Sequence, residues 1–276
     1  MDAIPNLHEF RDALIAGDCA TVTRLLDAHP SLLTTEPWQP HWDGAPLDMV
    51  ARQCTFHRPE AHRLANLLVQ RGAPCDLPTA ARCGLLDRAQ QLLDAHPELG
   101  NAIDEQNRTA VYRATCVSGR FDEGLAVTDL LLARGAALDL FSACTLGNVK
   151  RVEQLLRADS ELARTRDPEG MTALHWAARI RRNPQHAVAI TQLLMTHGAD
   201  VQARNPQEDQ MTALHHVAEW GGSIEQADLL LQHGANLNSA TRHGLTPLCY
   251  AVDRDRKDMI AHLTKLGARQ TPPPAT

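Results

Sequence analysis

The stretch that decides the fold is TALHWAARIRRNPQHAVAITQLLMTHGADVQARN, residues 172–205. It opens with Thr-Ala-Leu-His, continues through a leucine-rich segment and ends in Gly-Ala followed by polar residues. Two further copies follow it, TALHHVA from Thr212 and TPLCYAV from Thr246, each with its own leucine cluster and Gly-Ala ending. Weaker copies precede it, APLDMVA with LLVQRGAP and TAVYRAT with LLLARGAA. The chain therefore contains an internal repeat, which has to be recognised before any single motif is interpreted.

The spacing of the Gly-Ala endings gives the number of repeats. Successive endings are 63, 63, 36 and 33 residues apart, at Gly72, Gly135, Gly198, Gly234 and Gly267. An interval of 63 holds two repeats, and the intervening ones carry different endings, LLDAHPSL, LLDAHPEL and LLRADSEL. Eight repeats result, beginning near residues 6, 43, 76, 107, 138, 170, 210 and 244. We expect a single array over residues 1–270 and a disordered, proline-rich tail at 271–276.

Each repeat has the pattern of two short helices. Thr at its start suits a helix N-cap, and the paired alanines allow the helices to lie close together. In the second segment Ile190, Leu193 and Leu194 recur at helical spacing, and Gly198 then ends the helix. Composition agrees, because 78 of the 276 residues are Ala or Leu and only 10 are aromatic, which favours helices over strands. The predicted fold class is all-α.

These motifs resemble the ankyrin repeat family over roughly residues 6–270. The match is strongest from TALHWAA through LLMTHGADVQARN and in the next two repeats, whereas PTAARCG and FSACTLG lack the Thr-x-Leu-His box. The resemblance implies an all-α solenoid of antiparallel helix pairs with short β-hairpin loops and a concave binding face. It implies no catalysis. At the third and fifth repeats we do not expect hairpins.

The remaining composition narrows the function classes. The net charge of −6 gives no general basic excess for nucleic-acid binding. The seven cysteines are odd in number and form no CxxC pair, which is typical of a reduced, cytoplasmic protein. No segment has the length and apolarity of a membrane span. We interpret the Ala and Arg richness as bacterial coding bias, and we expect a monomer without a cofactor.

Histidine and cysteine raise an enzymatic alternative. His175 and His215 occupy the box position, which in ankyrin repeats ties neighbouring backbone together, and we interpret them as structural. The densest ligand-like cluster is Cys54, His57 and His62, but no second pair lies close in sequence to complete a zinc site. No GxSxG, GxxxxGKS or HExxH motif occurs. A Cys/His-dependent hydrolase or metal enzyme is therefore kept only as an alternative to a non-enzymatic scaffold.

Every second repeat is five or six residues longer between its helices, and the added segments are basic. We expect them to form an arginine ledge along one edge, which is either a contact surface or merely solvated loop charge. The ledge is the basis of a second alternative, a nucleic-acid binder. Its residues are Arg52, His57, Arg58, His62, Arg63, Arg113, Arg120, Arg179, Arg181, Arg182 and His186.

The leading prediction is a scaffold that binds another protein through its concave face and hairpins. Concave positions follow the paired small residues of the first helix, and Trp and Arg are the residue types that most often anchor interfaces. Two further tryptophans lie in the loop EPWQPHWDG. The predicted partner-binding residues are Arg52, Arg82, Arg179, Ile180, Trp220, Arg254, Trp38 and Trp42. Trp176 and Tyr250 are expected to pack inside.

Overall fold

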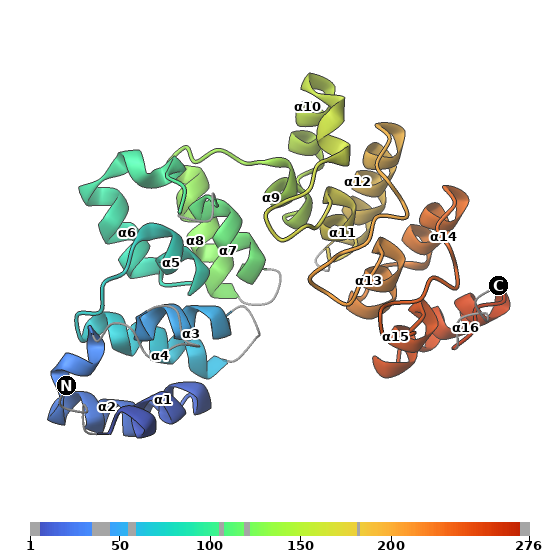
Figure 1. Ribbon diagram of the computed structural model, residues 1–276. Helices are drawn as coiled ribbons and strands as arrows, with labels where there is room; N and C mark the ends of the chain where they lie inside the picture. Colours follow the sequence, from blue (N-terminus) through green and yellow to red (C-terminus); the bar gives the residue numbers. More distant parts are fainter. Residues whose placement is uncertain are drawn as a thin grey trace. The chain divides into compact units, whose positions relative to one another are not determined.

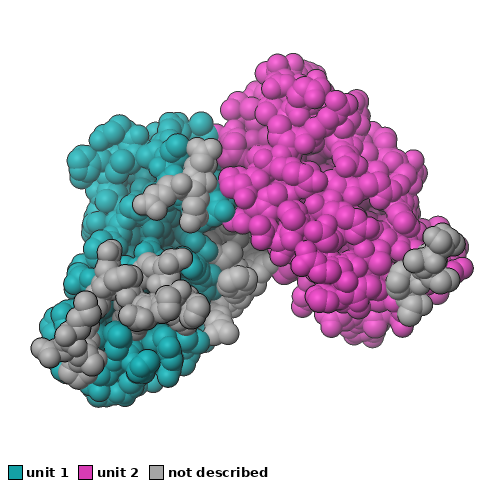
Figure 2. Space-filling view, in the orientation of Figure 1, with its two compact units in different colours: residues 1–137 teal, residues 138–276 magenta. Residues whose placement is uncertain are grey.

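The computed structural model describes residues 6–34, 45–54, 59–104, 108–118, 122–180 and 183–270. The chain divides into two compact units, unit 1 at Met1–Ala137 and unit 2 at Leu138–Thr276 (Figure 2). In the described residues the α-helices form eight consecutive pairs, four in each unit (Figure 1). The all-α prediction is confirmed, whereas the single array expected over residues 1–270 stays a prediction. The proposed tail at 271–276 lies outside the described residues.

Unit 1 contains the first four pairs. Its helices are α1 (Leu7–Ala16), α2 (Cys19–Ala28), α3 (Pro46–Cys54), α4 (Pro59–Gln70), α5 (Leu77–Arg82), α6 (Leu86–Ala95), α7 (Ala110–Ser118) and α8 (Asp122–Ala133). Two short 3-10 helices, η1 (Pro30–Leu33) and η2 (Pro97–Asn101), follow α2 and α6. They account for the LLDAHP endings, because proline fits the first turn of a helix but cannot continue the one before it.

Unit 2 contains the other four pairs. Its helices are α9 (Leu140–Thr145), α10 (Val149–Ala158), α11 (Ala173–Ala177), α12 (Pro184–Thr196), α13 (Ala213–Trp220), α14 (Ile224–Gln232), α15 (Pro247–Asp253) and α16 (Lys257–Lys265), with η3 (Ser160–Arg164) after α10. The helices α12, α14 and α16 are each followed by a glycine at φ +81° to +90°, namely Gly198, Gly234 and Gly267. The predicted glycine stops are thereby confirmed, since this left-handed conformation suits glycine.

The box histidines join one repeat to the next. His175 Nε2 donates to the carbonyl oxygen of Met211 at 3.2 Å, which leaves Nδ1 to accept from the amide and hydroxyl of Thr172 at 3.1 and 2.8 Å. His215 repeats this arrangement with Thr212. Burial lowers the pKa of both rings from 6.5 to about 4. The structural interpretation of these histidines is confirmed, because each neutral ring satisfies buried backbone groups on both sides.

The third and fifth repeats use a different start signal. Asp76 and Asp139 cap α5 and α9, and their side chains accept from the amides of Thr79 and Ser142 at 2.8 Å. Among the described residues, isolated β-bridges close loops before the fourth, sixth and seventh helix pairs, at Ile103↔Thr109, Arg166↔Thr172 and Asn205↔Met211. The absence of a Thr-x-Leu-His box in PTAARCG and FSACTLG thus reflects an aspartate cap in its place.

The core is a series of thin layers between helix pairs. Leucines such as Leu25, Leu64 and Leu156 are buried together with the paired alanines of the first helices. On the surface of unit 1, carboxylates of one repeat meet arginines of the next, Asp27 with Arg71 at 2.7 Å and Asp94 with Arg134 at 2.8 Å. No helix in the described part of the chain is both long and apolar enough to cross a membrane.

Candidate interaction site

Three of the predicted partner-binding residues meet in unit 2. Arg179 follows the end of α11, Trp220 is the last residue of α13, and Arg254 follows α15. Each lies one to three residues after the last buried alanine at the end of its helix, so the stacking of α11, α13 and α15 brings them to one edge. The guanidinium carbon of Arg179 lies 5.2 Å from the centroid of the Trp220 ring, and that of Arg254 lies 5.6 Å from it. We call Arg179, Trp220 and Arg254 the tryptophan cluster.

Two carboxylates hold the arginines of the tryptophan cluster in place. Glu208 accepts from Arg179 Nη2 at 2.8 and 3.0 Å, and Glu219 accepts from Arg254 Nη2 at 2.6 Å. The hydrogen bond from Glu219 raises the pKa of Arg254 above its usual value. The Arg179 side chain is 14% exposed and that of Arg254 is 47% exposed, so one arginine is largely covered and the other faces solvent. Cation–π contacts of this kind contribute about 0.5–2 kcal/mol, more where water is excluded.

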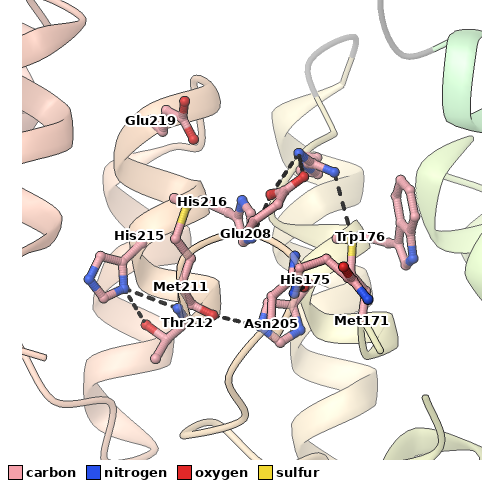
Figure 3. Close-up of polar contacts among 12 residues, drawn as sticks. Met171, His175, Trp176, Asn205, Glu208, Met211, Thr212, His215, His216 and Glu219 are labelled. Atoms are coloured by element: carbon pink, nitrogen blue, oxygen red, sulfur yellow. Dashed lines mark hydrogen bonds and ion pairs between the residues drawn. The ribbon is translucent and has the colours of Figure 1, made fainter. Parts of the chain in front are cut away.

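Glu208 reaches Arg179 because its hairpin is longer than the preceding one. The amide of Asn205 bonds to the carbonyl of Met211, six residues on, whereas the equivalent bond in the preceding hairpin, from the amide of Asp167, spans four residues. The two extra residues place Glu208 over the ends of the helices. Its Oε2 also lies 3.6 Å from Nε2 of His216, a fully buried ring (Figure 3).

The sequence carries a signal for this extension. Thr212 follows Gly198 by 14 residues, whereas Thr246 follows Gly234 by 12. The repeat pattern alone does not assign Glu208 to the site, and the prediction of contact residues missed it. The longer interval between a Gly-Ala ending and the next box is the feature that could have pointed to it.

Trp176 lies beneath the tryptophan cluster. Its indole Nε1 donates to Asp167 Oδ2 at 2.7 Å, and Asp167 Oδ1 accepts from the amide of Met171 at 2.8 Å. The guanidinium carbon of Arg179 is 5.5 Å from the Trp176 ring centroid, so Arg179 contacts both indoles. Trp176 is buried, as expected from its position directly after the box histidine. Trp176 therefore packs against Arg179 from the protein interior and exposes little surface to a partner.

The other predicted contact residues are not part of the tryptophan cluster. Ile180 is only 5% exposed, because its Cγ2 methyl packs close to Gly147, and we correct its assignment as a partner contact. Arg52 and Arg82 lie in unit 1, the first exposed at the end of α3 and the second half-buried at the end of α5. Trp38 and Trp42 lie outside the described residues.

Among the described residues, two arginines of the predicted ledge form ion pairs with carboxylates of the chain. Arg113 is buried and forms an ion pair with Asp104, while Arg179 pairs with Glu208. Arg63 is exposed on α4. The ledge residues His57, Arg58, Arg120, Arg181 and Arg182 lie outside the described residues. Two of its arginines thus serve internal contacts.

The catalytic and metal alternatives gain no support from the geometry. His62 Nδ1 lies 2.5 Å from the carbonyl oxygen of Cys83, a bond between neighbouring repeats, while His57 and the Cys54 side chain lie outside the described part of the chain. Within the described ranges no group of three or more His, Cys, Asp or Glu residues could hold a metal ion. Burial raises the pKa of Cys75 to about 11 and that of Cys144 still further. Thiols protonated in this way are poor nucleophiles at neutral pH.

The comparisons with known proteins agree with this architecture. A family model described as ankyrin repeats in three copies matches residues 180–272. Ankyrin repeat protein nuc-2 of Neurospora crassa is 28% identical over 194 residues, covering 67% of this chain and 17% of that protein. The B-cell lymphoma 3 protein homolog of Mus musculus is 29% identical over 196 residues, covering 71% and 41%. Human ankyrin repeat and SOCS box protein 6 is 28% identical over 171 residues, covering 59% and 39%.

The chain thus spans less than half the length of each of these relatives. Residues 180–272 match the ankyrin repeat family, and the paired helices and histidine links between repeats give the described chain the fold of an all-α ankyrin repeat protein.

Proposed function

We propose that this protein is a non-enzymatic scaffold that binds a partner protein through the tryptophan cluster and the neighbouring hairpins of unit 2. Ankyrin repeats are in general protein-interaction scaffolds, and the relatives above are ankyrin repeat proteins. The observation that carries the proposal is the half-buried Trp220 indole with Arg179 and Arg254 over its ring. Tryptophan and arginine dominate the energetics of protein interfaces.

The tryptophan cluster is ordered before any partner arrives. Glu208 and Glu219 fix the two guanidinium groups, and Trp176 supports Arg179 from the interior. A partner therefore meets side chains that lose little conformational freedom on binding, which favours affinity. Arg254 is exposed, donates to Glu219 through Nη2 and has Nε 3.7 Å from Asp253, which leaves Nη1 as a donor for a partner acceptor. We further propose that the protein acts as a cytoplasmic monomer; a bacterial origin stays a prediction.

The test is capture of the full chain at native abundance followed by mass spectrometry and a binding titration. We expect one stoichiometric partner. Replacing Trp220→Ala together with Arg254→Gln should weaken its binding by at least about 30-fold, because truncating a hot-spot tryptophan costs about 2 kcal/mol or more. Leu86→Ala, which removes an exposed apolar side chain from unit 1, is the matched control and should bind as the wild type does.

Two results would count against the proposal. The first is the recovery of no stoichiometric partner. The second is a partner whose affinity is unchanged by the double substitution while the thermal unfolding of that variant matches the wild type.

A further inference from the structure

Three exposed arginines lie on successive hairpin loops of unit 2, apart from the tryptophan cluster. Arg166, Arg204 and Arg242 precede the sixth, seventh and eighth helix pairs, and all three side chains are exposed. None belongs to the ledge predicted from the insertions between helices. We call Arg166, Arg204 and Arg242 the hairpin arginine row.

Hydrogen bonds to the backbone place the members of the row next to one another. Arg166 Nη1 donates to the carbonyl oxygen of Arg204 at 2.9 Å. Arg204 Nη1 in turn donates to the carbonyl oxygen of Ala240 at 2.8 Å, two residues before Arg242. The amide of Arg242 donates to the carbonyl oxygen of Asp209 at 2.9 Å, which joins the last two hairpins. The row is therefore continuous across three repeats.

These bonds orient the guanidinium groups of Arg166 and Arg204 without neutralising them. Both backbone acceptors of Arg166 are reached through Nη1, so its Nε and Nη2 make no hydrogen bond to the described residues. Arg204 uses Nη1 for two carbonyls and Nη2 for the hydroxyl of Ser239 at 3.2 Å. No carboxylate among the described residues forms an ion pair with Arg166, Arg204 or Arg242. The positive charge of the row is thus left for a ligand.

Three carboxylates of the same hairpins lie against other groups of the protein. Asp167 is buried and accepts from Trp176, and Glu208 accepts from Arg179. Asp209 is 19% exposed, with its Oδ1 3.6 Å from Nε2 of His243. Asp167 therefore faces the protein interior and Glu208 is held by Arg179, whereas the three arginines are exposed without a paired carboxylate among the described residues. A chain with net charge −6 presents here a local basic surface.

We propose that the hairpin arginine row binds an acidic segment of the partner protein. Guanidinium groups match carboxylates through paired N–H donors, and a group whose orientation is fixed loses less entropy per bond. Three arginines on adjacent loops suit an extended segment that carries several carboxylates. A nucleic-acid ligand is disfavoured, because a long phosphate backbone would extend past the three arginines over a chain of net charge −6, whereas a short acidic segment can end within the row.

This inference rests on the proposed function and identifies the chemistry of the partner. It is tested with a fluorescein-labelled oligoglutamate peptide, titrated with the full chain at about 50 mM NaCl, where surface charges are weakly screened. One variant carries Arg166→Gln, Arg204→Gln and Arg242→Gln. The matched control carries Arg24→Gln, Arg63→Gln and Arg157→Gln, three exposed arginines elsewhere that change the net charge equally.

We expect the peptide to bind the wild type and to bind the row variant at least about 10-fold more weakly. The control variant should stay within about 2-fold of the wild type. Equal losses in both variants, or no binding by the wild type, would overturn the inference. So would tighter, row-dependent binding of a single-stranded oligothymidylate at the same salt, which would indicate a nucleic-acid ligand.

The proposed function and this inference can fail separately. If a captured partner depends on Trp220 but not on the hairpin arginine row, the scaffold function stands and the acidic-segment inference is wrong. If no partner is captured, the proposed function fails, and the acidic-segment inference falls with it.

Discussion

The neutral box histidines predict a specific dependence of stability on pH. Burial lowers the pKa of His215 in the folded chain from 6.5 to about 4, so the unfolded chain takes up a proton at a higher pH than the folded chain does. The contribution of His215 to stability is therefore complete above about pH 6.5 and is lost as the pH falls toward 4. A pKa gap of this size corresponds to about 3 kcal/mol, of which about 2 kcal/mol is lost by about pH 5.

The perturbation that isolates this effect is His215→Gln. Glutamine at this position can still bond back to the amide of Thr212, as in the usual capping box, but it does not titrate. We expect the variant to be less stable at about pH 7.5, since the bond from Nε2 to Leu245 is weakened or lost. On lowering the pH to about 5, however, the variant should lose about 2 kcal/mol less than the wild type.

The assay is urea unfolding followed by far-UV circular dichroism at the two pH values. His233→Gln is the matched control, because it removes an exposed imidazole from the same unit. Its loss of stability between the two pH values should equal that of the wild type. If His215→Gln loses as much free energy of unfolding as the wild type does on acidification, the attribution to a buried neutral ring is refuted.

Three further outcomes follow from the contacts. Asp104→Asn should destabilise the protein by about 3 kcal/mol in urea unfolding, because it leaves the guanidinium of Arg113 buried without its carboxylate; a loss below about 1 kcal/mol would contradict this. Cys75 and Cys144 should react with a thiol-specific disulfide reagent only as fast as the chain unfolds, since both are buried and burial keeps their thiols protonated; rapid labelling of these two cysteines in the native protein, located by peptide mapping, would argue against it. Gly234→Ala should cost about 1 kcal/mol, measured by thermal unfolding, because φ is +90° there although no atom lies near the added methyl group; an unchanged melting temperature would refute the strain.

The repeat made most of the fold predictable from the sequence. Helix starts, glycine stops and the histidine links all depend on short-range patterns. Because the pattern recurs along the chain, the strong repeats allow the weak ones to be identified by their spacing. The aspartate caps at Asp76 and Asp139 show the limit of such patterns. The strongest repeats begin with a threonine, which the third and fifth repeats lack. In those two repeats an aspartate side chain accepts the capping hydrogen bond from the helix amide, which the repeat pattern does not predict.

The candidate site was only partly predictable. Trp220, Arg179 and Arg254 could be assigned to one edge because each follows the buried small residues of its helix. Ile180 occupies an equivalent place but is covered, since its environment depends on packing against the preceding repeat. Glu208 could not be placed by the repeat pattern, because it lies in the two-residue extension where the pattern stops. Contacts made by residues outside the repeat pattern, such as that of Glu208 with Arg179, can be assigned only from the structure.

The ion pairs between Asp27 and Arg71 and between Asp94 and Arg134 have a consequence for how such a chain can change in length. In both cases an LLDAHP repeat supplies the acid and the following Gly-Ala repeat supplies the base. Deletion or duplication of one repeat would place two aspartate-bearing or two arginine-bearing repeats next to each other. Gain or loss of two repeats would keep each aspartate beside an arginine of the following repeat. In unit 1 the period of these ion pairs is therefore the doublet, about twice the length of the ankyrin repeat.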